Sequence, residues 1–331
     1  MSSRRQRPSR LLSMSTSPSL HYLAQPPVPP PGTGTAAAPR GRRRDHALAV
    51  GIGTVLTPVS LTVIGLAATR DASGLVLQSV LMLAVFGALC ASAATFFAAR
   101  SSAGALATGL TALLAQMVIL LAPGHIVTIS APWSRPLAHT WMVLVMAGLW
   151  LGGAWGMRLA RRGGHVQGRL AFRLTQSDKE VGTTPTPPPS RRRDHLASLP
   201  WVLGSLVLTA AILSRYYRIA VSPGVHLSLV TTASILAALA LLVAAGASVG
   251  RSTLGARVTG LLLVLVSLPP LISTAVAERW PVHHLLPRGP GPVVTAAIGL
   301  TLLVLGWGGH AARRQARTRE LDALRASHQE P

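Results

Sequence analysis

The feature that most limits how this chain can fold is a series of long apolar runs without acidic or basic side chains. Eight runs are separated by arginines, acidic residues or helix breakers. Each approaches the roughly 20 residues that a helix needs to cross a bilayer. Only 12% of the residues are charged, whereas soluble domains are about one-quarter charged. We therefore predict an all-α integral membrane protein with eight transmembrane helices, over residues 47–68, 75–99, 104–122, 137–157, 196–214, 225–250, 258–277 and 292–309.

The chain also repeats itself. Arg-Arg-Arg-Asp-His occurs at residues 42–46 and again at 191–195, each time after a proline run and before an apolar region. Residues 100–110 match residues 251–261 at seven of eleven positions. A third match aligns Trp155, Arg161 and Arg162 with Trp307, Arg313 and Arg314. The three matches keep nearly the same spacing of 149, 151 and 152 residues, which predicts two tandem repeats of four helices each.

An even number of helices per repeat means that both repeats enter the membrane from the same side. We therefore expect the halves to be related by a pseudo-two-fold axis along the membrane normal. The predicted organisation has five parts. They are a disordered basic and proline-rich tail (1–44), membrane repeat 1 (45–160), a proline- and arginine-rich linker (161–193), membrane repeat 2 (194–312) and a C-terminal tail (313–331).

Positive charge predicts the orientation. If the N-terminus is cytoplasmic, 25 of the 31 basic residues lie on the cytoplasmic side and six on the other, as the positive-inside rule requires. The net charge of +22 does not predict nucleic-acid binding, because the arginines occupy tails and loops rather than one folded surface. Serines, a proline and a histidine interrupt residues 11–24, so no signal peptide is expected. We predict a multi-pass plasma-membrane protein with both termini and the linker in the cytoplasm.

The two arginine clusters have two compatible interpretations. Positive residues next to a membrane helix determine its topology, and they also attract anionic headgroups by about 1 kcal/mol each. The predicted partners are therefore the lipid bilayer with anionic headgroups and other membrane proteins. The proline runs read as extended spacers, although polyproline can also dock on a recognition domain. The arginines concerned are Arg42, Arg43, Arg44, Arg191, Arg192 and Arg193.

Catalytic patterns are missing from the sequence. No Asp, Glu or Lys lies within the eight runs, whereas membrane enzymes and proton-coupled pumps usually carry buried ionisable residues. The chain has no P-loop, dinucleotide fingerprint or His-Glu-x-x-His pattern. Its single cysteine, Cys90, lies in an apolar run and is expected to pack as a small side chain. We predict a non-enzymatic protein without a cofactor.

Helix packing is the clearest role that individual residues predict. Gly148, Gly152 and Gly156 recur every four residues on the fourth run, a spacing that lets another helix approach closely. Gln78 and Gln116 are the strongest polar side chains expected to be buried, and either could hydrogen-bond across helices. Prolines in the first and seventh runs are expected to kink those helices.

Two long loops on the predicted outer face are rich in histidine. His125 and His139 follow the third run, while His283 and His284 follow the seventh. Imidazoles bind transition metals or titrate near neutral pH. These four residues are therefore weak candidates for a metal site, against the simpler reading of solvated loops.

Three hypotheses about function remain open. The first is a permease-like or scaffold component that acts through helix packing with partners. The second is a transporter of a neutral or apolar solute, with its path at the interface between the repeats. The third is an extracytoplasmic metal or pH sensor built from the paired histidine loops.

Overall fold

The computed structural model describes residues 39–121, 133–181, 192–222, 228–273, 276, 279 and 291–328. These residues are helical apart from short turns, and no strand occurs among them. Eight of the described helices are long and apolar enough to cross a membrane, as predicted. They are α1 (Pro39–Ala72), α2 (Val76–Ala99), α3 (Ala103–Leu121), α5 (Met142–Val181), α6 (Arg192–Ala220), α7 (Leu229–Ser248), α8 (Leu254–Ile272) and α10 (Gly291–Ser327), with a short helix α4 (Ser134–Ala138) before α5.

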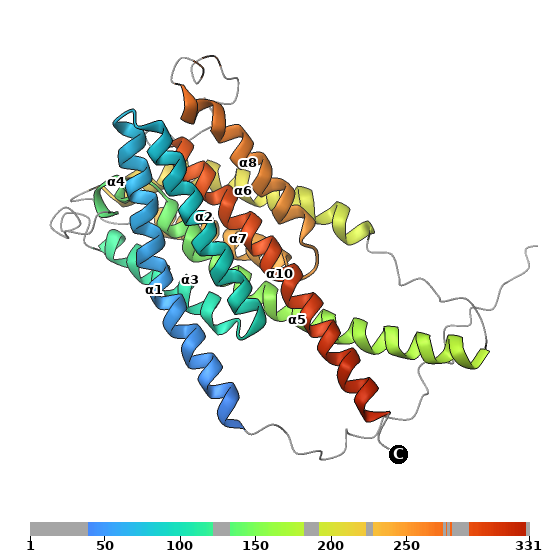
Figure 1. Ribbon diagram of the computed structural model, residues 1–331. Coiled ribbons are helices and arrows are strands. Elements are labelled where there is room, and N and C mark those ends of the chain that lie inside the picture. Colours follow the sequence, from blue (N-terminus) through green and yellow to red (C-terminus); the bar gives the residue numbers. More distant parts are fainter. Residues whose placement is uncertain are drawn as a thin grey trace, which may run out of the picture. The chain divides into compact units, whose positions relative to one another are not determined.

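Two of these helices form the centre of the unit that covers residues 42–331. In α5 and α10, 78% of the most apolar 18-residue window is buried, against 33–44% in the other six. The two helices pack most extensively on each other. In addition α5 packs on α3 and α7, while α10 packs on α8 and α2. In Figure 1, α5 and α10 run through the bundle and continue beyond it.

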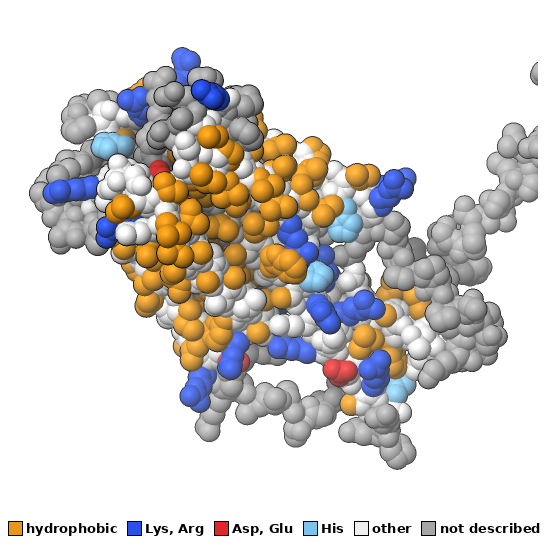
Figure 2. Space-filling view, turned by 45° about the horizontal axis from the view of Figure 1, so that its top comes forward, with side chains coloured by type: hydrophobic (Ala, Val, Ile, Leu, Met, Phe, Trp, Pro, Cys, Tyr) orange, Lys and Arg blue, Asp and Glu red, His pale blue; other side chains and the backbone are white. Residues whose placement is uncertain are grey.

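The six outer helices surround this pair. The hydroxyl of Thr57 in α1 donates to the carbonyl of Thr108 in α3 at 2.8 Å, and α6 packs on both α7 and α8. Large apolar side chains on the outer helices are exposed, among them Leu77, Leu114 and Val207. Figure 2 shows a broad hydrophobic surface, with most arginines beyond its ends. An apolar exterior of this kind suits a protein in contact with lipid tails.

Four helices, α1, α5, α6 and α10, extend further than the apolar runs that predicted them. α1 begins at Pro39, inside the segment expected to be a disordered tail. α5 continues to Val181, so the first part of the expected extended linker is helical. The physical reason is that α5 keeps a packing partner after the apolar run ends, since Gly164 and Gly168 lie directly against α10. Most of the proline-rich part of the linker lies outside the described residues.

Candidate functional site

The polar contacts of the bundle concentrate at one end, which we call the basic end. Here α1 and α6 begin, α2 and α7 finish, and α3 and α8 start. Turn residues Ser101 and Ser252 place their hydroxyls at the starts of α3 and α8. Ser101 accepts from the backbone N–H of Ala103 at 3.1 Å, and Ser252 accepts from that of Leu254 at 3.3 Å. Each hydroxyl thereby satisfies a backbone donor that a helix start leaves without a partner.

A histidine from a neighbouring helix contacts each of these serines. His46 Nδ1 lies 2.6 Å from Ser101 Oγ, and His195 Nδ1 lies 2.8 Å from Ser252 Oγ. Ser198 adds a further bond from its hydroxyl to that of Ser252 at 3.0 Å. These contacts join the starts of α1 and α6 to the turns that precede α3 and α8.

Two arginines bind the carbonyls where α2 and α7 finish. Arg161 of α5 donates to the carbonyl of Ala98 at 2.8 Å and also to that of Phe97. Arg313 of α10 donates to the carbonyl of Arg251 at 3.2 Å and also to that of Gly250. The last carbonyls of a helix carry partial negative charge, so a guanidinium there stabilises the helix end.

The contact between α5 and α10 is built from small side chains. A Cβ added at Gly153 would meet the side chain of Leu305, and one added at Gly164 would meet Ala316. A Cβ at Gly168 would meet the side chain of Glu320. Such small residues let two helix backbones approach closely in a membrane protein.

Beyond this contact, Glu320 links the two helices through charge. Its carboxylate lies 2.8 Å from His165 Nδ1 and accepts from Arg169 Nε at 2.6 Å. The glutamate is mostly shielded, with 16% of its side chain exposed. The two helices therefore stay attached to each other where their sequences have become polar.

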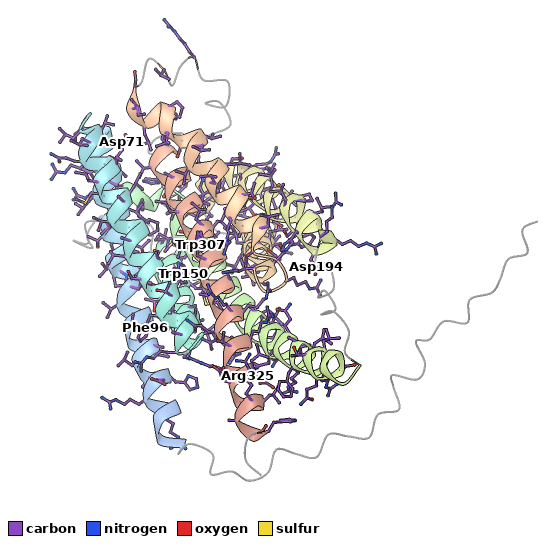
Figure 3. All side chains as sticks on the ribbon, turned by 45° about the vertical axis from the view of Figure 1, so that its right-hand side comes forward. Asp71, Phe96, Trp150, Asp194, Trp307 and Arg325 are labelled. Atoms are coloured by element: carbon purple, nitrogen blue, oxygen red, sulfur yellow. The ribbon has the colours of Figure 1, made fainter. Side chains whose placement is uncertain are left out.

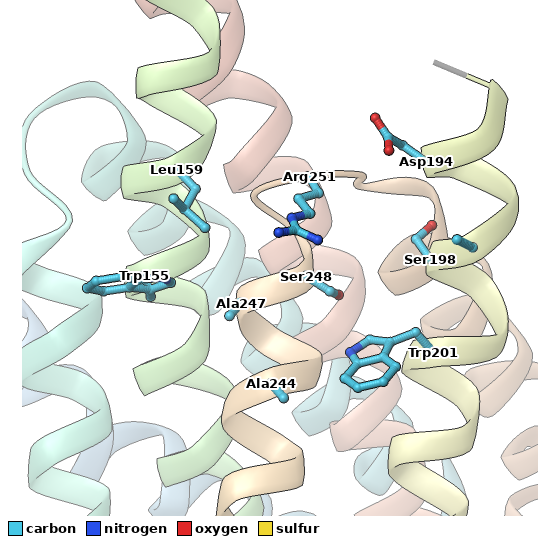
Figure 4. A pocket seen from close by; sticks show the side chains of 10 residues that line it. Trp155, Leu159, Asp194, Ser198, Trp201, Ala244, Ala247, Ser248 and Arg251 are labelled. Carbon is cyan, nitrogen blue, oxygen red and sulfur yellow. The ribbon is translucent and has the colours of Figure 1, made fainter.

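A hollow of about 490 Å³ lies at the basic end between α5, α6 and α7 (Figure 4). Its floor is the small-residue face of α7, and Trp155 of α5 and Trp201 of α6 flank it. Asp194 and Arg251 lie at its polar end, and no ion pair joins them among the described contacts. The lining residues are Trp155, Leu159, Asp194, Ala197, Ser198, Trp201, Ala244, Ala247, Ser248 and Arg251.

The sequence segments that match this site, around Asp45 and Arg100, carry different contacts. Asp45 and Arg100 form an ion pair of 2.6 Å there. Phe96 and Phe97 occupy the last turn of α2. The ring of Phe97 packs edge-on against Trp150 at 6.1 Å between centroids. In Figure 3, Phe96 lies toward the end of α2 and Asp194 at the start of α6.

The predicted glycine face lies against α7. A Cβ at Gly148 would meet Leu242, one at Gly152 would meet the carbonyl of Val243, and one at Gly156 would meet the carbonyl of Gly246. The sequence had not indicated which helix is the partner. Gly153, one position away, faces α10 instead, so this short segment of α5 contacts two helices at once.

The two glutamines predicted to be buried differ in the structure. Gln116 is fully buried, and its amide donates to the hydroxyl of Tyr217 in α6 at 3.1 Å. The prediction for Gln78 is wrong, because this side chain is exposed near the start of α2. Sequence reasoning missed Tyr217 as the partner; its only signal is a tyrosine beside arginines at the end of an apolar run.

The remaining candidates are only partly described. His139 is exposed, whereas His125, His283 and His284 lie outside the described residues. Arg43, Arg44, Arg192 and Arg193 are exposed at the helix starts. Arg191 and the side chain of Arg42 are not described. Among the described residues, no three His, Cys, Asp or Glu side chains come together as a metal site would require.

Comparisons of the chain with known protein-family models, with curated proteins and with solved structures found no match. The geometry at the basic end can bind polar and charged groups next to an apolar surface.

Proposed function

We propose that this multi-pass membrane protein is a non-enzymatic, permease-like scaffold component made of two tandem four-helix repeats. The observation that carries the proposal is the contact between α5 and α10. Gly153 meets Leu305, Gly164 meets Ala316 and Gly168 meets Glu320, and the members of each pair stand 152 residues apart. Residues that face their own counterparts are expected along a two-fold axis between parallel helices.

Other contacts support the repeats independently. Gly104 packs on the carbonyl of Ala49, as Gly255 packs on that of Ser198. Gly109 meets the backbone nitrogen of Leu151, as Gly260 meets that of Leu303. The bonds of His46 to Ser101 and of His195 to Ser252 follow the same spacing. All of these pairs agree with the spacings of 149 to 152 residues between the matching sequence segments.

A scaffold role is supported by how firmly the halves are joined. Close helix packing between α5 and α10 forms the centre of the surface between them, and the buried Gln116–Tyr217 pair joins α3 to α6. Past the apolar region, α5 continues to Val181 and α10 to Ser327. We call these C-terminal parts of the two helices the arms; Glu320 of α10 connects them by its contacts with His165 and Arg169 of α5. Exposed arginines on these arms, such as Arg173 and Arg317, provide a basic surface for an acidic partner.

The proposed orientation places the basic end and both arms in the cytoplasm, because most basic residues then lie on that side. The arginines at the starts of α1 and α6 would contact anionic headgroups there. The partner of the arms is then a cytoplasmic protein or the cytoplasmic part of another membrane protein.

Photo-crosslinking in intact cells tests the scaffold. A photoreactive residue in place of Arg173 or Arg317 should give one discrete adduct with another protein, identified by mass spectrometry. The same residue in place of Leu77, an exposed apolar side chain of α2, is the matched control and should give lipid adducts. If mild-detergent purification and both arm positions return only the isolated monomer, the scaffold proposal fails.

Two other functions predicted from the sequence have their own tests. A transporter of a neutral or apolar solute would change uptake or efflux across a broad solute panel when the gene is deleted. A sensor built from the histidine loops would lose metal content or pH response when His125, His139, His283 and His284 are replaced by alanine. The packed contact of α5 with α10 supports the scaffold above these alternatives.

A further inference from the structure

The hollow between α5, α6 and α7 has the chemistry of a binding site, independently of the proposed scaffold role. We infer that it holds one zwitterionic phospholipid, whose headgroup carries both a phosphate and an ammonium group. The phosphate would lie at Arg251 and the ammonium at Asp194, while the first part of an acyl chain would follow the face of α7.

The first support is the contrast between the two halves. Asp45 and Arg100 neutralise each other through a 2.6 Å ion pair, whereas Asp194 and Arg251 stand at the same repeat positions and line an open hollow. An acidic residue in the first turn also favours a helix start. That role fits Asp194 in the first turn of α6 but not Asp45, because α1 begins at Pro39 and has no acidic residue in its first turn. A helix-start role for Asp194 does not account for Arg251, which lines the same hollow.

The second support is the size of the side chains on the floor. At the spacing of 151 residues, Ala247 and Ser248 of α7 take the places of Phe96 and Phe97 in α2. The matching positions of α2 therefore carry two phenyl rings, of which Phe97 packs on Trp150, whereas a methyl and a hydroxymethyl group line the hollow on α7. Small side chains on α7 thus leave room for a ligand beside Asp194 and Arg251.

The third support is the order of polarity along the hollow, which Figure 4 shows. Asp194 and Arg251 lie at one end, Trp155 and Trp201 beside the middle, and Ala244 at the other end. The two tryptophans are 55% and 54% exposed. Tryptophan side chains prefer the level of the lipid headgroups, so the charged end faces the headgroup region and the alanine end faces the acyl chains.

The charges select the headgroup. Arginine binds phosphate through paired N–H donors, and a carboxylate nearby favours a ligand that also carries a positive charge. An anionic lipid without an ammonium group would satisfy Arg251 but be repelled by Asp194. A soluble phosphate compound would leave the alanine and tryptophan surfaces without an apolar partner.

Native mass spectrometry of the purified full-length protein tests this site. The protein is incubated in detergent with equal amounts of phosphatidylethanolamine, phosphatidylglycerol and phosphatidylcholine. Wild-type protein should retain one zwitterionic lipid, phosphatidylethanolamine or phosphatidylcholine, in preference to phosphatidylglycerol. Arg251→Ala should reduce its occupancy about tenfold, as expected when a charged hydrogen bond is lost. Arg251→Lys should restore part of the binding, and Asp194→Asn should remove the preference over phosphatidylglycerol.

A steric variant and a matched control complete the test. The double variant Ala247→Phe with Ser248→Phe introduces the two phenylalanines of the matching segment of α2 into the lining of the hollow and should abolish retention. Arg100→Ala removes the cation of the first half and should leave retention unchanged. The inference is overturned if the double variant, still eluting as folded protein, keeps the lipid, or if Arg251→Ala binds like wild type. It is also overturned if glycerophosphoethanolamine, which has no acyl chains, displaces the lipid at equal concentration.

Discussion

The two central helices and the six outer helices place their apolar residues in opposite ways. Among the eight described spans, α5 and α10 are the least hydrophobic and at the same time the most buried. In a soluble protein, burial and hydrophobicity would increase together. In a bilayer the lipid tails are as apolar as leucine, so close packing rather than hydrophobicity selects the inner residues. Glycines therefore lie where the central helices approach their neighbours most closely, while many leucines and valines of the outer helices face outward.

Replacing a glycine on α5 by a larger residue should cause the largest loss of stability if close packing selects the inner residues. Gly152→Leu would place a side chain against the backbone of Val243. Because a backbone cannot give way as a side chain can, we expect a loss of at least about 3 kcal/mol in the free energy of unfolding. Reversible unfolding in mixed micelles measures this loss.

The matched control for that substitution is Gly204→Leu on α6. A Cβ at Gly204 meets nothing within 4 Å, so the stability should change by no more than about 0.5 kcal/mol. Equal losses at both positions would show that glycine is needed for the helices themselves and would contradict the comparison.

Removing a hydrogen bond between an inner and an outer helix should cause the next largest loss in the free energy of unfolding. Arg161→Ala removes the donor to the carbonyls of Phe97 and Ala98 at the end of α2. Hydrogen bonds from a charged group contribute about 1.5–3 kcal/mol, so we expect a loss in that range. Arg162→Ala alters an exposed neighbour and should leave the melting temperature nearly unchanged. A similar shift for both variants would indicate that charge, rather than the bond, is responsible.

A buried pair between two outer helices should matter less. Gln116→Leu removes the hydrogen bonds with Tyr217, and polar contacts of this kind contribute about 0.6 kcal/mol on average and at most about 1.7 kcal/mol. Gln78→Leu, on an exposed face, is the control and should be neutral. The prediction is wrong if thermal unfolding shows that Gln78→Leu is less stable than Gln116→Leu.

The smallest effect is expected at the exposed ion pair. Asp45→Asn removes the carboxylate that Arg100 contacts, and both side chains are well exposed, at 38% and 53%. Exposed pairs contribute less than about 1 kcal/mol and are screened by salt. Unfolding of wild type and variant should therefore become indistinguishable at high salt; a difference that persists would show that the pair is more shielded than its exposure indicates.

The sequence predicted the number of spanning helices because the runs without charge are long and clearly separated. It did not predict that α5 continues to Val181, because residues 163–168 contain three glycines and look like a loop. Those glycines are helical since α10 lies against them, and no local pattern reports a partner more than 140 residues away.

The candidate site was harder to predict for the same reason. Asp194 and Arg251 were visible as parts of the matching segments, but the hollow depends on Ala247 and Ser248 facing residues of two other helices. Only the packing of three helices determines whether two small residues leave a space. Gly148, Gly152 and Gly156 were recognised as a close-packing face, whereas their partner α7 became apparent only in three dimensions.

The contact of Gly153 with Leu305 has a consequence for how such a protein can change. Two identical chains meeting at a symmetry axis must present the same side chain from both sides, so a glycine pair leaves a gap and a leucine pair collides. Joining both copies in one chain removes this restriction, and a knob on one helix can then fill a hole in the other. If this chain is the duplicated protein proposed above, it can reach a tighter interface than two separate copies could. Once it carries such unequal pairs, it can no longer be divided back into two equal subunits.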